Sequence, residues 1–246
     1  MRTDSQVTLN RAVFTQTAFE SRALTVLTTL LHRFTEPGRY RVHVQHPAMP
    51  VRDLTVNVSK DAKKTQENID LSGTGDRGHD CCCGADEDIE LAVNGVLGLY
   101  PSTGVGGYRV TVSSVPAEGT EAPASGRDER TLLDTEKGVP AGDYFAVVLT
   151  RPGTYLLTAR DARAEVKVEL PRRERLRTDQ PTLVVLGAEG FQPGSVSQLA
   201  GRALVVQCDV DALLRVELVE PEGGGEREDR RKHTYRRPRR PGPEHA

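Results

Sequence analysis

Residues 34–40 read Phe-Thr-Glu-Pro-Gly-Arg-Tyr, and residues 149–155 read Leu-Thr-Arg-Pro-Gly-Thr-Tyr. The two stretches are 115 residues apart, and each places a Pro-Gly corner directly before a run that alternates apolar and polar residues. A tyrosine at the start of such a strand can cap the core of a β-sandwich with its ring, and its hydroxyl can donate a hydrogen bond back to the corner backbone. The echo therefore predicts two related corners, each near the end of a sandwich.

Short runs rich in Val and Thr, with period-two alternation and Gly or Pro at their ends, are the commonest pattern along the rest of the chain. Long helical patterns are scarce. We expect strands at 40–46, 52–58, 89–93, 107–113, 143–149, 154–159, 164–169, 182–187, 203–208 and 213–219. Asn94-Gly95 follows one of these strands directly and is the dipeptide best suited to a tight hairpin. The predicted fold class is all-β, made of antiparallel β-sandwich modules.

The composition describes a globular chain of one or two modules. Aromatic residues make up 4% of the 246 residues and Trp is absent, so the core relies on Val, Leu, Ile and Ala, which argues against a carbohydrate-binding platform. No apolar run approaches the roughly 20 residues of a membrane-spanning helix. The N-terminus lacks the pattern of a secretory signal, so we expect a cytoplasmic location, or an extracellular one only for an already processed chain.

The order of strands and polar stretches suggests a division of the chain. Residues 1–59 are interpreted as a sandwich half or a small β module, 60–88 as a polar Cys-rich linker or loop, and 89–171 as a sandwich domain. Residues 180–220 resemble another sandwich half, which either completes the module of 1–59 around the inserted domain or forms a small module of its own. Residues 221–246 have almost nothing to bury and are predicted to be a disordered basic tail.

Three stretches carry a resemblance to a known fold family. GFQPGSVSQLAGRALVV (190–206) resembles the opening of cupredoxin-like domains, and PGRYRVHVQHPAMPVRDLTVNV (37–58) and PGTYLLTARDARAEVKVEL (152–170) resemble their closing strands. Immunoglobulin-like modules share these motifs. The resemblance implies a sandwich of one of these two kinds, and the sequence does not choose between their strand orders.

True cupredoxins bind copper with a thiolate, two imidazoles and often a thioether. The resemblance places His46 and Met49 near positions of such ligands, while Val44 stands in the neighbourhood of the required Cys. In the second closing stretch, residues 159–161 are Ala, Arg and Asp, none of which is a soft ligand. The resemblance thus implies the fold without a complete copper site.

Two groups of residues are candidate metal ligands. The first is His79, Cys81, Cys82 and Cys83, because thiolates and an imidazole bind zinc or copper. Redox chemistry, or a loop without a chemical role, is the alternative for this stretch. The second group is His43, His46 and Met49, although His43 and His46 would lie on opposite faces of a regular strand.

The basic tail is a candidate polyanion-binding arm, since Lys and Arg neutralise phosphates without reading sequence. An ordinary chain end or a peptide that becomes ordered on a partner is the alternative. The residues expected to carry polyanion binding are Arg230, Arg231, Lys232, Arg236, Arg237, Arg239 and Arg240.

The chain holds no complete catalytic motif, such as the G-x-S-x-G turn of a serine hydrolase. We therefore expect a non-enzymatic structural or protein-interaction subunit of a larger homo- or hetero-oligomeric assembly, without a cofactor. A zinc- or copper-binding protein is the alternative function. A nucleic-acid accessory protein that acts through the tail is the third.

Overall fold

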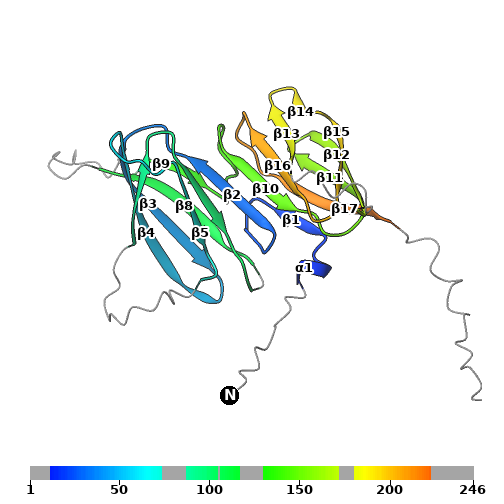
Figure 1. The fold of residues 1–246 in the computed structure, drawn as a ribbon, viewed down its shortest axis with the longest axis horizontal. Helices are drawn as coiled ribbons and strands as arrows, with labels where there is room; N and C mark the ends of the chain where they lie inside the picture. The colour runs from blue at the N-terminus through cyan, green and yellow to red at the C-terminus, as the bar shows by residue number, and fades with distance from the viewer. Residues whose placement is uncertain (1–11, 74–86, 105, 117–129, 172–179, 223–246) are drawn as a thin grey trace, which may run out of the picture.

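The described part of the chain is nearly all β and forms three sheets (Figure 1). The computed structural model describes residues 12–73, 87–104, 106–116, 130–171 and 180–222. We call the sheets the first outer sheet, the central sheet and the second outer sheet. A one-turn helix, α1 (Ala12–Thr15), precedes the first strand and is the only helix among the described residues. It is far too short to cross a membrane.

Hydrogen bonding sets the spatial order of the strands in each sheet. The first outer sheet contains β6 (Glu87–Ala92), β4 (Met49–Ser59), β3 (Gly38–His46), β8 (Arg109–Val115) and β9 (Thr131–Asp134). The central sheet contains β14 (Gly190–Gln192), β13 (Thr182–Gly187), β16 (Ala203–Cys208), β10 (Tyr144–Val148), β2 (Thr28–Arg33), β7 (Val96–Tyr100) and β5 (Gln66–Asp70). The second outer sheet contains β1 (Ala18–Glu20), β17 (Arg215–Pro221), β11 (Gly153–Ala159), β12 (Ala162–Glu169) and β15 (Ser195–Leu199).

The described residues form two halves whose strand arrangements match, except that β14 of the second half has no counterpart in the first. The first half is the first outer sheet with β2, β7 and β5, and the second half is the second outer sheet with β10, β16, β13 and β14. Read in the same direction, β6, β4, β3, β8 and β9 correspond to β15, β12, β11, β17 and β1. Corresponding pairs also run in the same sense, since β4–β6 and β12–β15 are parallel and β3–β4 and β11–β12 are antiparallel.

A pseudo-twofold axis passes through the middle of the central sheet. β2 and β10 are antiparallel neighbours there, and Leu30 pairs with Phe145. These two residues are 115 apart, as the two Pro-Gly corners are, so each is the counterpart of the other. Both are fully buried. The halves are therefore joined by continuous backbone hydrogen bonding and a shared core.

The first strands of the two repeats are exchanged between the halves. In chain order the first repeat begins with β1 and the second begins with β9. β1 nevertheless pairs with β17 of the second half, and β9 pairs with β8 of the first half. Phe19 of β1 and Leu133 of β9 are buried in these exchanged positions. Separating the two sequence repeats would consequently break both outer sheets as well as the central one.

Matching hydroxyl contacts support the correspondence of β1 and β9. Thr135 Oγ1 accepts the backbone N–H of Val110 at 3.0 Å, and the Thr135 N–H donates to the Val110 carbonyl at 3.0 Å. Ser21 makes the same two contacts with Leu214, at 3.0 and 2.9 Å. Both hydroxyl side chains are buried, so each hydroxyl satisfies a backbone donor that water cannot reach. This contact fixes the end of each exchanged strand.

The two Pro-Gly corners have the predicted tyrosine geometry. The hydroxyl of Tyr40 donates to the Glu36 carbonyl at 2.8 Å, and that of Tyr155 donates to the Arg151 carbonyl at 3.0 Å. Both rings are buried, and burial raises the pKa of both phenols. The prediction made from the repeated corner is confirmed, since each ring caps a core and each hydroxyl returns to the corner backbone.

The all-β prediction is confirmed, but the sheets are mixed and not purely antiparallel. The pairs β4–β6, β5–β7, β12–β15 and β13–β16 are parallel. The chain from β4 to β7 alternates between the first outer sheet and the central sheet, as in a short solenoid. Strands two apart in sequence then lie side by side and run in the same direction. Alternation along a strand predicts its faces and carries no information on this pairing.

Two local predictions are corrected. Asn94 has the expected left-handed backbone, with a φ of 65°, but its turn joins β6 to β7 in different sheets, so no hairpin forms there. Residues 66–70, inside the stretch expected as a linker, form β5. The apolar side chain of Ile69 is buried in an otherwise polar strand, which explains why the strand pattern was weak in the sequence.

The sheets also group the strands differently from the expected division of the chain. β3 and β4 of the expected first module pair with β8 and β6, and β15 and β16 pair with β12 and β10. Among the described residues, the expected module of 1–59 contacts the stretch 180–220 where β1 pairs with β17. Backbone hydrogen bonds next to this pair join Thr17 to Leu218 and Ser21 to Leu214. The predicted basic tail lies outside the described residues.

Candidate functional site

The Cys-rich metal-binding candidate and the basic polyanion-binding candidate both lie outside the described residues. His79, Cys81, Cys82 and Cys83 fall in the gap between 73 and 87, and the basic residues from Arg230 to Arg240 follow residue 222. The predictions of metal binding and polyanion binding at these residues stay predictions.

The second metal candidate, which combines His43, His46 and Met49, is described completely. His43 Nδ1 lies 2.7 Å from a carboxylate oxygen of Asp53, whereas His46 Nε2 lies 2.9 Å from the Gly106 carbonyl. Met49 Sδ accepts a hydrogen bond from a phenol, that of Tyr108, at 3.2 Å. The three side chains thus have three separate partners. Within the described ranges, no three His, Cys, Asp or Glu side chains form a group suited to a metal ion.

Cys208 and His32 lie in the interior. Cys208 is fully buried in β16, and burial raises the pKa of its thiol to about 12. His32 Nδ1 lies 2.6 Å from a carboxylate oxygen of Asp143, and the other oxygen accepts the backbone N–H of Arg33 at 3.0 Å. Since His32 is in β2 and Asp143 directly precedes β10, this buried pair connects the two repeats.

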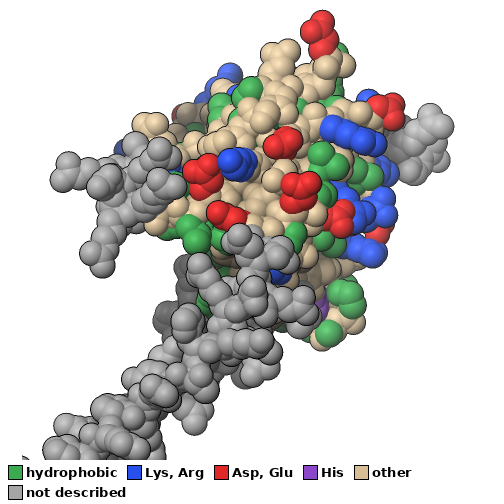
Figure 2. All heavy atoms as spheres, turned by 90° about the vertical axis from the view of Figure 1, so that its right-hand side faces the viewer, with side chains coloured by type: hydrophobic (Ala, Val, Ile, Leu, Met, Phe, Trp, Pro, Cys, Tyr) green, Lys and Arg blue, Asp and Glu red, His purple; other side chains and the backbone are tan. Residues whose placement is uncertain are grey.

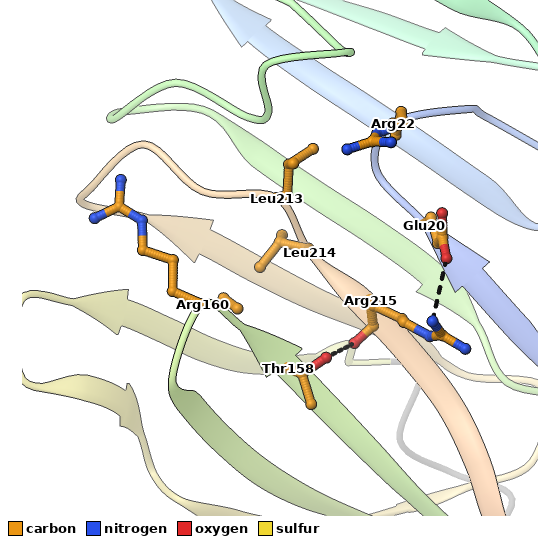
Figure 3. A pocket seen from close by; sticks show the side chains of 8 residues that line it. Glu20, Arg22, Thr158, Arg160, Leu213, Leu214 and Arg215 are labelled. Carbon is orange, nitrogen blue, oxygen red and sulfur yellow. Dashed lines mark hydrogen bonds and ion pairs between the residues drawn. The ribbon is translucent and has the colours of Figure 1, made fainter.

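Two adjoining hollows occur at the end of the second half, around the turn between β11 and β12. The first, which we call the arginine hollow, has a volume of about 260 Å³ (Figure 3). It lies where the exchanged strand β1 meets the end of β11 and the start of β17. Its lining includes the apolar side chains of Leu213 and Leu214 and the charged side chains of Glu20, Arg22, Arg160 and Arg215.

The charges around the arginine hollow are only partly neutralised. Arg215 lies 2.9 Å from Glu217 and 3.7 Å from Glu20, in exposed ion pairs. Arg160 Nη2 donates to the backbone carbonyl of Asp211 at 2.7 Å, so its charge has no carboxylate partner in that contact. Arg22 is exposed at the edge of the hollow and makes no hydrogen bond or ion pair with any described residue. An anionic group near the hollow would meet a net positive rim.

The second hollow, which we call the alanine hollow, has a volume of about 310 Å³ and shares Ala159 and Arg160 with the first. Small side chains dominate its lining, among them Ala159, Ala162 and Ala212, with Leu186 and Val210 beside them. The face of the molecule seen in Figure 2 carries acidic and basic side chains intermingled, without a broad field of one sign.

No family model matches this chain, and no curated protein and no solved structure matches it. The described residues define a structural class, a tandem all-β protein whose repeats exchange their first strands. Any function has to be argued from the hollows themselves.

Neither hollow was predicted from the sequence. The arginine hollow combines residues from β1, from the turn after β11 and from the start of β17, so no local motif could reveal it. The only feature of the sequence that pointed toward the hollows was the repeated corner, because a repeat allows its two copies to be compared position by position. That comparison becomes reliable only when strand register is known.

Proposed function

We propose that this protein is a non-enzymatic interaction subunit that binds an acidic segment of a protein partner at the arginine hollow, within a larger assembly. The observation that carries the proposal is the positive rim, in which Arg22 and Arg160 have no carboxylate partner among the described residues and lie on either side of the apolar pair Leu213 and Leu214. Protein interfaces are enriched in Arg and combine an apolar centre with a polar rim. A carboxylate-bearing segment suits both features, because guanidinium groups bind carboxylates with two parallel hydrogen bonds.

The rigidity of the scaffold supports the same proposal. The exchanged strand β1 forms one wall of the hollow, and it is held by pairing with β17 and by the hydroxyl of Ser21. A surface that is already ordered loses little conformational entropy when a partner binds. The open edges of the outer sheets offer further places for strand addition by a second subunit.

Each half is, in this proposal, a degenerate sandwich of the cupredoxin-like or immunoglobulin-like kind. The tyrosine corners at Tyr40 and Tyr155 resemble the corner known from immunoglobulin-like domains. The parallel pairs β4–β6 and β12–β15 differ from the two antiparallel sheets of an immunoglobulin sandwich and favour the cupredoxin-like alternative.

The test combines native mass spectrometry with light scattering over a wide range of concentrations. The wild-type protein is expected to form a defined oligomer or to retain a co-purifying partner, and Arg22→Glu should weaken that association at least tenfold. Arg39→Glu, which reverses an exposed arginine of the first half, is the matched control and should leave it unchanged. A strictly monomeric protein without a partner, or equal effects of the two reversals, would refute the proposal.

A further inference from the structure

The two halves differ at several corresponding positions where the alanine hollow lies. Val44 and Arg52 pair across the β3–β4 hairpin, and the corresponding pair in the β11–β12 hairpin is Ala159 and Ala162. The correspondence follows from register, because Gly38 pairs with Val58 in one hairpin and Gly153 pairs with Val168 in the other. Two larger side chains of the first half are thus alanines in the second.

A third position shows the same difference. Tyr108 exchanges two backbone hydrogen bonds with Leu24, and Ala212 exchanges the same two with Val139. Leu24 and Val139 are 115 residues apart, the spacing of the repeat. A buried tyrosine in the first half is therefore replaced by alanine in the second, and Ala159, Ala162 and Ala212 all line the alanine hollow.

In the first half this region is filled by aromatic side chains. The β3–β4 hairpin extends beyond Val44 and brings His46 onto Tyr108, with ring centroids 4.5 Å apart and an interplanar angle of 31°. The imidazole Nε2 lies 2.9 Å from the Gly106 carbonyl, and the phenol donates to Met49 Sδ. The first half thus holds two stacked rings with their polar atoms satisfied.

The second half has no rings at the corresponding positions, and the space that the rings fill in the first half is left as the alanine hollow. Its hairpin closes after Ala159 with a two-residue turn, Arg160 and Asp161, and no extension covers Ala212. Val210 lies two residues before Ala212, as Gly106 lies two residues before Tyr108, and it lines the hollow. Pockets for small molecules start at about 300 Å³, so this hollow is large enough for one ring compound.

We propose that the alanine hollow is a binding site for a small aromatic ring that carries an N–H or O–H donor. The ring takes the place that Tyr108 and His46 occupy in the first half, between Ala159, Ala162 and Ala212, and its donor is directed to the Val210 carbonyl. Arg160 at the rim can stack on the ring face, as guanidinium groups do on aromatic rings. The ring belongs either to a free small molecule or to an exposed side chain of a peptide.

Ring binding at the alanine hollow is a separate proposal from partner binding at the arginine hollow, although Arg160 lines both hollows. It rests on the differences between the two repeats and does not involve Arg22. Every variant that tests it leaves Arg22 unchanged, so partner binding can fail while ring binding succeeds, and the reverse.

The experiment is an NMR titration of the ¹⁵N-labelled full chain with phenol, imidazole and indole, with cyclohexanol as a non-aromatic control of similar size. We expect at least one aromatic probe to shift the amides of Gly187, Gly190 and Ala212 with millimolar affinity, and cyclohexanol to bind at least tenfold more weakly. N-acetyltyrosine amide distinguishes the two sources of the ring. Tighter binding than phenol indicates a peptide side chain, and weaker binding indicates a free molecule.

The decisive variant is Ala212→Tyr, which introduces the residue that the first half already has at the same position. It should reduce binding of the aromatic probe at least tenfold, while Ala48→Tyr at the exposed tip of the β3–β4 hairpin should not change it. If Ala212→Tyr fails to fold, Ala162→Arg, which copies Arg52, tests the same prediction. The proposal is overturned if none of the aromatic probes shifts these amides, if cyclohexanol binds equally well, or if a folded filling variant binds the probe like the wild type.

Discussion

Two His–Asp pairs in this protein have nearly the same geometry and very different surroundings. His32 Nδ1 lies 2.6 Å from Asp143, with side chains that are 6% and 3% exposed. His43 Nδ1 lies 2.7 Å from Asp53, with side chains that are 34% and 48% exposed. Replacing Asp143 or Asp53 by alanine therefore removes the same contact from the interior and from the surface of one molecule.

The expected cost follows from what each aspartate leaves behind. Without Asp143, the imidazole of His32 and the backbone N–H of Arg33 both lose their acceptor in the interior. A buried donor without a partner costs about 1–3 kcal/mol, and Asp143→Ala leaves two such donors in the interior. We expect Asp143→Ala to lower the free energy of unfolding by about 3–5 kcal/mol. Asp53→Ala should cost about 0–1 kcal/mol, because water replaces the lost acceptor.

Urea denaturation of both variants measures these costs from the shift of the midpoint at constant slope. Asp143→Asn is a second variant of the same shape, which keeps one acceptor oxygen and should lie between the wild type and Asp143→Ala. Equal destabilisation by Asp143→Ala and Asp53→Ala would refute the argument that the buried pair holds the two repeats together.

Three further predictions concern other parts of the molecule. Phe19→Ala should lower the free energy of unfolding by about 3–5 kcal/mol. Amide hydrogen exchange should rise in β11 and β17, because the exchanged strand β1 completes the second half. A rise confined to β2 and β7 would contradict the strand exchange. Cys208 should resist iodoacetamide at pH 8 until the protein is denatured, since its pKa of about 12 keeps the thiol protonated, and peptide mass mapping would detect any early labelling. Burial would raise the pKa of Asp70, but hydrogen bonds from Ser102 and Ser72 lower this pKa overall. The stability that Asp70 contributes is therefore fully present above the ordinary carboxyl pKa of about 3.9 and is lost as the pH falls through the lowered pKa. Asp70→Asn should consequently flatten the acid limb of the curve of stability against pH.

Several features could be predicted from the sequence because they depend on neighbouring residues. Alternation along 40–46 and 154–159 indicated strands with one buried face, and the burial of Tyr40 and Tyr155 agrees with it. The Pro-Gly corners indicated a repeat, since a corner and the tyrosine that returns to it lie within a few residues of each other.

Other features depend on which strands become neighbours. β1 has only three residues and no strong pattern, so its pairing with β17 could not be predicted. The pair of His32 and Asp143 joins residues 111 apart, and the arginine hollow brings Glu20 next to Arg215. Each of these contacts is long-range, and a run of alternating residues does not encode the identity of its partner strand.

The sequence by itself determined that the chain is all-β, that a corner recurs after 115 residues, and which runs alternate between two faces, because these properties follow from local geometry and from the period of two along a strand. The tertiary structure alone decided that the repeats exchange their first strands, that some neighbours run parallel, and that a space filled by aromatic rings in one half is lined by alanines in the other. Strand pairing is set by the packing of whole sheets, and a difference between two equivalent positions becomes visible only when that pairing has aligned them.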